Sequence, residues 1–309
     1  MGKPIAVMDL GTNTFHLLIA EGDPANPTIL FKSTDPVKLG EGGINKGIIQ
    51  PAAFERGVKA MQQFNEHILK YDVGQIRAIA TSALRSAANG QQFIDDVKAK
   101  TGISIETING DEEAGFIYKG VKAGGCLSDK NSLIMDIGGG SIEFIAGNQD
   151  GILWKQSFEL GAARLMDQFH QIDPITPDAI NTLKAYLDER LADLFNAMKA
   201  YQIDYLVGSS GAFDTFAEVI EATKGNTTFD IKKIKNYSFN NDELIKTTDY
   251  LIQSSHGERA SNKSIIPVRV DMIVVSSIAT RYIMQKLNIT KVMQSTNSLK
   301  EGVVADMLG

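Results

Sequence analysis

The sequence predicts an α/β protein built from two similar domains, and three observations predict it. The chain has 309 residues, which is enough for two domains that each bury a core. The phrase "MDLGTNTFHLLIA", beginning at Met8, returns in nearly the same form as "MDIGGGSIEF" at Met135. After each copy, apolar segments of strand length alternate with longer segments of helical spacing. An order of strands and helices that occurs twice indicates two α/β halves.

The first half is expected to contain three strands followed by alternating helices and strands. Two apolar segments around "GTN" predict a β-hairpin over 4–20, and "PTILF" predicts a third strand. Pro51 begins a predicted helix in which apolar residues recur at helical spacing. "QIRAIAT" and "ISIETI" predict two further strands, which are separated by a turn and a helix over 82–102.

The second half repeats this order. "NSLIMDI", "SIEFIAG" and "GILWKQSFEL" predict three strands. A helix is predicted over 176–201, with Thr176 as its N-cap and Pro177 at its first position. "DYLVGSSG" predicts a strand that ends in a turn, and helices are expected over most of the remaining chain. "NITKVMQST" predicts one more strand before a terminal helix, "LKEGVVADMLG".

A linker between the two domains is predicted near "KAGGCLSDKN", where glycines cluster between a helix and a strand. The expected domains are therefore 1–125 and 126–309. The terminal helix, over about 298–309, is free to pack back on the first domain in this scheme.

Composition excludes several classes of protein. No apolar run reaches the roughly 18 residues that span a bilayer, and "MGKPIAVMDLG" lacks a signal-peptide core. We therefore expect a cytoplasmic protein without a membrane span. The single cysteine, Cys126, rules out intramolecular disulfides and a thiolate zinc cluster. The net charge of −6 argues against binding to a nucleic-acid duplex.

The repeated phrase has the chemistry of an anion site. Glycine lets a tight turn after a strand point several backbone N–H groups at one anion. An Asp before such a turn repels phosphate but holds Mg²⁺ or its water shell. One glycine-rich hairpin is usually structural, whereas two copies that open two domains favour a binding site. We call residues 11–14 the first turn and residues 138–141 the second turn; a third turn, 208–211, lies in "VGSSGAFDT".

Together these turns resemble those of the acetate kinase, sugar kinase, Hsp70 and actin superfamily. Within it, the sequence is similar to the exopolyphosphatase and guanosine pentaphosphate phosphohydrolase family, in its short two-domain form. The matching segments follow the family's order across nearly the whole chain: "AVMDLGTNTFHLLIA", "VKLGEG", "FERG", "ATSALRSAANG", "INGDEEAGFIYKGV", "LIMDIGGGSIEFI", "ELGAARL" and "SLKEGVV". Neither GxxxxGK[ST] nor a GxGxxG after a strand is present. The resemblance implies two ribonuclease-H-like domains, the actin-like ATPase fold, with an active-site cleft between them.

The resemblance also implies an activity. Members of the family hydrolyse terminal phosphoanhydride bonds, so the expected substrates are inorganic polyphosphate and guanosine pentaphosphate, with Mg²⁺ as cofactor. Many members are dimers, so a homodimer is expected on that ground alone. Two alternatives stay open: an ATP-dependent kinase on the same fold, and a sensor that binds polyphosphate or a nucleotide without turnover.

Two acids are the expected catalytic residues. The second Glu of the family's E-E pair is catalytic and falls on Glu113, and a further family acid falls on Glu143. From the residues alone, Glu113 is better explained as an acid that favours a helix N-terminus, together with Asp111 and Glu112. For Glu143 the alternative is a solvent-facing strand acid. Two acids near one water would supply a general base.

The expected ligands of phosphate and metal come from the turns and from the resemblance. The residues expected to contact phosphate are Gly11, Thr12, Asn13, Thr14, Arg85, Gly138, Gly139, Gly140, Ser141, Arg164, Gly208, Ser209, Ser210 and Gly211. Asp9 and Asp136 are the expected metal residues. For Arg85, a surface salt bridge is the alternative. Arg56 is expected to be structural or at the cleft rim, and His16 to be hydrogen-bonded and partly buried.

The sequence departs from the family pattern at four positions. Gly115 and Lys300 replace common arginines, Asn297 replaces a common Asp, and Ala212 replaces a Thr of the third turn. These departures leave both glycine turns and both glutamates in place, and they leave open what the resemblance implies for affinity and substrate preference.

Overall fold

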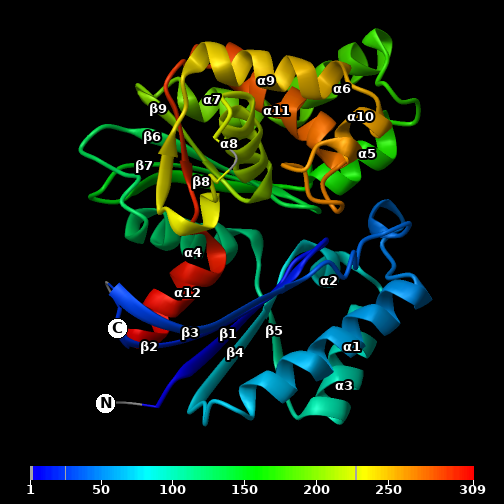
Figure 1. Cartoon of the computed structure of the whole chain (residues 1–309), viewed down its shortest axis with the longest axis vertical. Helices are drawn as coiled ribbons and strands as arrows, with labels where there is room; N and C mark the ends of the chain where they lie inside the picture. Colours follow the sequence, from blue (N-terminus) through cyan, green and yellow to red (C-terminus); the bar gives the residue numbers. More distant parts are fainter. Residues whose placement is uncertain (1–2, 25, 227) are drawn as a thin grey trace. The chain divides into compact units, whose positions relative to one another are not determined.

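The computed structural model describes residues 3–24, 26–226 and 228–309, and it forms two compact units (Figure 1). Unit 1 contains Met1–Ala123 and Leu299–Gly309, and unit 2 contains Gly124–Ser298. The chain therefore crosses between the units after Ala123 and again after Ser298. Residues 1, 2 and 25 of the expected first domain and residue 227 of the second lie outside the described ranges.

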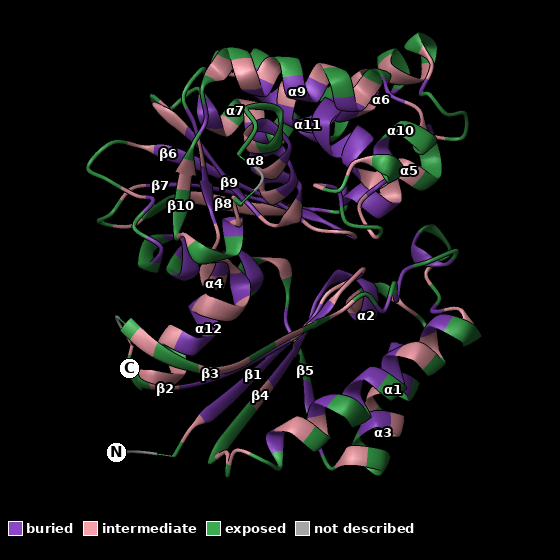
Figure 2. Cartoon of the chain, viewed as in Figure 1, coloured by how far each residue is buried: buried purple, intermediate pink, exposed green. Residues whose placement is uncertain are grey.

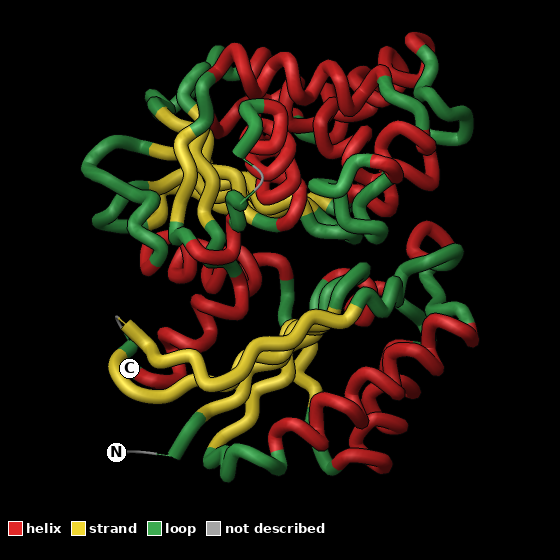
Figure 3. Tube along the Cα trace, in the orientation of Figure 1, coloured by secondary structure: helices red, strands yellow, loops and turns green. Residues whose placement is uncertain are grey.

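Unit 1 is built on a five-stranded sheet (Figure 3). Its strands are β1 (Ile5–Leu10), β2 (Phe15–Asp23), β3 (Asn26–Asp35), β4 (Gln75–Ala80) and β5 (Ile105–Thr107). Their order in the sheet is β3-β2-β1-β4-β5. The predicted hairpin is the antiparallel pair β1 and β2, to which β3 adds antiparallel, whereas β4 and β5 run parallel to β1.

The helices of unit 1 follow the predicted order. They are η1 (Ile44–Lys46), α1 (Pro51–Ile68), α2 (Ser82–Ser86), α3 (Gly90–Thr101), α4 (Gly110–Ala123) and α12 (Leu299–Leu308). Helix α1 begins at Pro51, as predicted, and buries Val58, Met61 and Phe64 on the expected face. Helix α12 packs along α4 and against β1 and β2, so the end of the chain belongs to the first sheet (Figure 1).

Unit 2 repeats the same sheet. Its strands are β6 (Ser132–Ile137), β7 (Ile142–Gly147), β8 (Ile152–Phe158), β9 (Tyr205–Ser209), β10 (Asn236–Ser238) and β11 (Val292–Ser295). Strands β8-β7-β6-β9-β11 have the order and directions of β3-β2-β1-β4-β5, and β10 adds an antiparallel edge. The prediction of two similar α/β domains is confirmed.

The helices of unit 2 differ from the prediction in two places. They are α5 (Ala162–Phe169), α6 (Pro177–Arg190), α7 (Ala192–Met198), α8 (Gly211–Thr223), η2 (Ile231–Lys233), α9 (Asn241–Gln253), α10 (His256–Ser261) and α11 (Met272–Lys286). The single helix predicted over 176–201 is wrong, because the backbone leaves helical geometry at Leu191, with ψ at 15°. Leu191 is buried, so packing overrides its helix propensity. Helix α5 and strand β10 were not predicted. Thr176 does cap α6 by accepting from the backbone N–H of Ala179 at 3.2 Å.

The core is densest around the first strands of the two sheets (Figure 2). Every residue of β6 and β7 is buried, and β1 is buried at five of its six positions. Strand β3, at the sheet edge, is largely exposed. In the described ranges, no helix has both the length and the apolar composition that crossing a bilayer requires. Two acids, Asp136 and Glu143, therefore lie within fully buried and mostly apolar strands.

Candidate active site

The first turn closes tightly between β1 and β2. The backbone N–H of Gly11 donates to the carbonyl of Thr14 at 3.1 Å. A Cβ atom at Gly11 would meet that same carbonyl oxygen at 3.0 Å, so any larger residue would crowd this closure. Asp9 lies directly across the hairpin from His16, on the side of the sheet where β1 ends.

His16 connects the first turn to the neighbouring strand. Its Nε2 lies 3.1 Å from the Thr14 hydroxyl and its Nδ1 lies 2.9 Å from the Thr34 hydroxyl. The ring is half-buried, so the expected hydrogen-bonded, partly buried histidine is confirmed. The His16 ring therefore links the Thr14 hydroxyl to the Thr34 hydroxyl, and the tautomer of the ring sets which of its nitrogens donates.

A loop after β3 is hydrogen-bonded to the first turn. The backbone N–H of Lys38 donates to the Asn13 carbonyl at 2.8 Å, and that of Gly40 donates to the Thr12 carbonyl at 3.0 Å. Arg56 of α1 holds this loop by donating to the carbonyls of Val37, at 2.8 Å, and Lys38, at 3.2 Å. The structural role expected for Arg56 is confirmed.

The second turn is held from behind by α5. The backbone N–H groups of Ala162 and Ala163 donate to the carbonyls of Gly138 and Gly139, at 2.8 and 2.9 Å. The Nε of Arg164 donates to the Gly140 carbonyl at 2.8 Å, and its guanidinium also pairs with Glu159. Arg164 thus supports the turn directly, while its expected contact with phosphate stays a prediction.

Two buried acids lie side by side next to the second turn. Asp136 and Glu143 are opposite partners on β6 and β7, and residues so placed have Cβ atoms about 4.5–5.5 Å apart. Their exposed fractions are 7% and 1%. Ser157, opposite Glu143 on β8, donates to Glu143 Oε1 at 2.7 Å, and the Ser298 hydroxyl donates to Asp136 Oδ2. A buried charge is costly unless it is paired or hydrogen-bonded, so these hydroxyls help to keep the acids in place.

The third turn joins the second. Ser209 is the parallel-strand partner of Asp136, and the Ser210 hydroxyl donates to the Ile137 carbonyl at 2.9 Å while accepting from its N–H at 3.2 Å. The buried Ser209 hydroxyl has no hydrogen-bond partner within the described ranges. Unit 2 therefore gathers both turns and both acids at the ends of β6 and β9.

Arg269 is a neighbour of the third turn that sequence reasoning missed. Its guanidinium lies against Gly211, where a Cβ atom would meet Nη2 at 2.0 Å, and it donates to the Thr215 hydroxyl at 3.2 Å. Asp214 of α8 pairs with it at 3.5 Å. Arg269 lies 54 residues after Thr215, and no local pattern links the two.

Two neighbouring acids at the start of α4, Glu112 and Glu113, have different surroundings. Glu112 forms a capping box with Asn109: its carboxylate accepts from the Asn109 N–H, and the Asn109 side chain accepts from the Glu112 N–H, both at 2.9 Å. Glu113 instead is buried, with 6% exposed. A role at the helix N-terminus therefore accounts for Glu112 and leaves Glu113 for another role.

Arg85 of α2 contacts Glu113. Its Nη1 donates to Glu113 Oε2 at 3.0 Å and to the Ile108 carbonyl at 3.0 Å. Thr81, just before α2, donates its N–H to the Leu10 carbonyl at the end of β1, at 3.5 Å. Unit 1 thus brings the first turn, Arg85 and Glu113 to the same end of its sheet.

The positions that depart from the family pattern have ordinary structural environments. Lys300 pairs with Glu301 at 3.3 Å, and both side chains are mostly buried. The Asn297 carbonyl accepts from the Ser295 hydroxyl at 2.8 Å. Gly115 lies half-buried on α4, two residues after Glu113.

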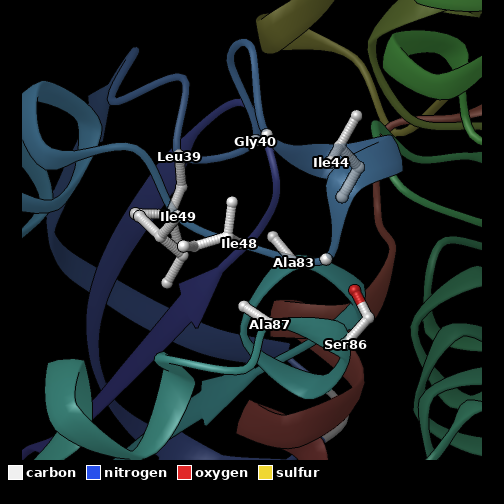
Figure 4. A pocket seen from close by; sticks show the side chains of 10 residues that line it. Leu39, Gly40, Ile44, Ile48, Ile49, Ala83, Ser86 and Ala87 are labelled. Atoms are coloured by element: carbon white, nitrogen blue, oxygen red, sulfur yellow. The ribbon is translucent and has the colours of Figure 1, made fainter.

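A pocket in unit 1 lies between α2 and the loop over 39–49 (Figure 4). It is lined mainly by the loop over 39–49 and by Ala83, Ser86 and Ala87, and its volume is about 10 Å³. That volume accommodates about one water molecule, so the pocket is too small for a phosphate or a nucleotide.

The acids suit Mg²⁺ by their chemistry. Mg²⁺ prefers oxygen ligands and is usually bound through one or two carboxylates, with substrate phosphates and water completing its shell. The described residues contain no group of three or more His, Cys, Asp or Glu side chains that would hold a metal by themselves. Asp136 beside Glu143, next to a glycine turn, would supply the one or two carboxylates. Substrate phosphate and water would then complete the shell of the ion.

Two ribonuclease-H-like sheets, each with an Asp-bearing strand that ends in a glycine turn, define the actin-like ATPase superfamily of phosphate-handling proteins. The chain belongs to the Ppx/GppA phosphatase family, which its residues 18–309 match.

Individual relatives agree with this assignment. A crystal structure of an exopolyphosphatase from Cytophaga hutchinsonii is 38% identical and superposes with a TM-score of 0.95, covering 99% of this chain and 98% of that one. The Aquifex aeolicus PPX-GPPA enzyme, at 22% identity and a TM-score of 0.82, covers 98% of this chain and 99% of that one and shares the fold. The bifunctional 3-dehydroquinate synthase/phosphatase of Fusobacterium nucleatum is 30% identical over 97% of this chain, which spans only 46% of that protein's length.

Proposed function

We propose that the protein is an Mg²⁺-dependent exopolyphosphatase that releases orthophosphate from the ends of inorganic polyphosphate. One observation carries the proposal: a buried Glu143 directly opposite Asp136, beside a glycine turn. The family assignment and the similarity to the Cytophaga hutchinsonii exopolyphosphatase support it. Guanosine pentaphosphate is a second candidate substrate, because its phosphate end presents the same phosphoanhydride chemistry.

In the proposed mechanism the chain supplies positioning, charge and a base, which are what phosphoryl transfer needs. The backbone N–H groups of the first and second turns bind phosphate oxygens. Arg85, whose planar fork donates two hydrogen bonds at once, neutralises charge that develops on the transferred group.

Each of the two glutamates is a candidate general base for the attacking water, and the one that acts takes a single proton from it. Glu113 is held by Arg85 and Glu143 by Ser157, so each carboxylate has a defined orientation before a substrate arrives. General-base catalysis of this kind contributes about 10²- to 10⁴-fold. Asp9 in unit 1 and Asp136 in unit 2 are each proposed to hold Mg²⁺, which would neutralise phosphate charge.

A side-by-side release assay tests the proposal. Purified protein is incubated with long-chain polyphosphate, guanosine pentaphosphate or ATP, with and without Mg²⁺, and orthophosphate is measured. We expect the fastest release from polyphosphate, and only with Mg²⁺. Binding of polyphosphate without release would instead favour the sensor, and ATP-dependent phosphorylation of an acceptor would favour the kinase.

A further inference from the structure

Lys38 has a strained backbone beside the first turn. Its φ is +50°, and in the described ranges only Lys38, Asp72, Ser210 and Asn288 combine a side chain with positive φ. Asn and Asp tolerate this region because their short polar side chains bond locally, whereas Lys has no such compensation. Ser210 belongs to the third turn, so two of the four strained residues lie at glycine turns.

Contacts on both sides of Lys38 maintain the strain. Its N–H donates to the Asn13 carbonyl at 2.8 Å, and its carbonyl accepts from Arg56 at 3.2 Å and from the Glu41 N–H at 3.1 Å. The neighbours Val37 and Leu39 are buried, with 1% and 0% exposed. The surroundings therefore hold the backbone of Lys38 by hydrogen bonds at its N–H and its carbonyl and by buried neighbours on both sides, and such support is what lets strain persist.

Lys38 is exposed to solvent next to the first turn. Since Val37 and Leu39 enter the core, Lys38 is the residue of this segment whose side chain faces solvent. Its backbone is bonded to the first turn, so its flexible four-carbon stem starts beside the predicted phosphate site. Within the described ranges its ammonium has no ion pair or hydrogen bond, in contrast to Arg56, which pairs with Glu41.

We propose that Lys38 is a substrate-binding residue whose ammonium contacts a phosphate of the polyanionic chain bound at the first turn. This inference rests on the proposed function and deepens it. A lysine ammonium is a compact point charge without bidentate geometry, so it suits one phosphate of a repeating chain. We therefore expect Lys38 to affect the affinity for the substrate and to have little effect on the rate of the chemical step.

The test compares variants that separate charge from backbone strain. Lys38→Asn removes the charge but keeps a residue that tolerates positive φ, and Lys38→Arg keeps the charge. Lys46→Asn removes an equal charge from the same exposed loop, but no bond joins Lys46 to the first turn. For each variant, KM and kcat for release from polyphosphate are measured at low and high salt, together with Tm.

We expect Lys38→Asn to raise KM about tenfold at low salt, with kcat within about twofold, because one charge-assisted contact is lost. This increase should shrink at high salt, while Lys38→Arg restores most of the affinity and Lys46→Asn behaves like the wild type. Lys38→Asn should melt at or above the wild-type temperature.

Equal KM values for Lys38→Asn and Lys46→Asn would overturn the inference, as would a fall in kcat at unchanged KM. If the wild type releases no phosphate from any substrate, the proposed function fails. Calorimetric titration with polyphosphate then decides Lys38 separately: a weaker Kd in Lys38→Asn alone supports the contact, and an unchanged Kd contradicts it.

Discussion

The hairpins β1-β2 and β6-β7 place different residues at equivalent positions. In the first, Asp9 lies opposite His16, which lies opposite Thr34 on β3. In the second, Asp136 lies opposite Glu143, which lies opposite Ser157 on β8. Each row runs across three strands and ends in a hydroxyl that hydrogen-bonds the middle residue.

The difference shows how a duplicated scaffold acquires separate roles. The strand order and the glycine turns are the same in both units, so the scaffold sets where the side chains lie. The middle residue then sets the chemistry: an imidazole hydrogen-bonds the hydroxyls on either side of it, whereas a second carboxylate lies beside the first and makes a pair of acids. Unit 1 has its buried acid elsewhere, at Glu113 of α4.

The largest expected effect concerns that acid. Glu113→Gln should lower kcat for phosphate release by about 10²- to 10⁴-fold, because the amide cannot act as a base. Binding of polyphosphate should remain within a few-fold. The matched control is Glu112→Gln, which keeps the capping box and should retain wild-type activity. Equal losses in both variants would point to the helix start, and would remove Glu113 from the mechanism.

The next prediction compares the loss of stability when a methyl group is added next to the second turn, at Gly161, and next to the first turn, at Gly40. A Cβ atom at Gly161 would meet the backbone of Gly139 at 2.3 Å, whereas at Gly40 it would meet the side-chain Cγ2 of Thr12 at 2.5 Å. Backbone yields less readily than a methyl group, so Gly161→Ala should destabilise by about 3 kcal/mol and Gly40→Ala by about 1 kcal/mol. Urea unfolding of both variants measures this, and the reverse order would refute the packing argument.

A smaller effect is expected at Ser298, which donates to Asp136. Outer-shell partners of this kind typically affect metal affinity by about tenfold or more. Ser298→Ala should therefore raise the Mg²⁺ concentration for half-maximal release about tenfold, with kcat at saturating Mg²⁺ within about twofold. Ser298→Thr, which keeps the hydroxyl, should restore the wild-type Mg²⁺ dependence. An unchanged Mg²⁺ dependence would argue against Asp136 as a metal residue.

The smallest effect contrasts the hydroxyls at the ends of the two rows. Ser157→Ala removes the donor to Glu143 and should lower kcat about fivefold, since one hydrogen bond contributes about 1 kcal/mol. Thr34→Val removes the partner of His16 and should change kcat by less than about twofold. Steady-state kinetics on both variants decide this, and a larger loss in Thr34→Val would invert the comparison.

Local pattern predicted most of the fold. The strand lengths and the glycine turns gave both hairpins. The strand register then shows that His16 and Glu143 occupy equivalent positions, opposite Asp9 and Asp136. Pro51 and Thr176 fixed helix starts because their backbone preferences act within one turn. Leu191 could not be predicted as a break, since the buried side chain belongs to a tertiary environment.

Some features of the candidate site can likewise be predicted from local sequence, and others cannot. The capping box of Asn109 and Glu112 is readable from a spacing of three residues, which would have separated Glu112 from Glu113 in advance. Ser157, Ser298 and Arg269 reach the turns through contacts made by the folded sheet, and the positive φ of Lys38 arises from a loop held by Arg56. No local pattern carries that information.

The most direct measurement of the account compares Glu143→Gln with His16→Gln, the middle residues of the two rows. Both substitutions keep a side chain that hydrogen-bonds, and orthophosphate release from polyphosphate is measured under saturating Mg²⁺. We predict a loss of about 10²-fold or more in Glu143→Gln and less than about tenfold in His16→Gln. Similar losses in the two variants would contradict the claim that the second turn carries the acid chemistry.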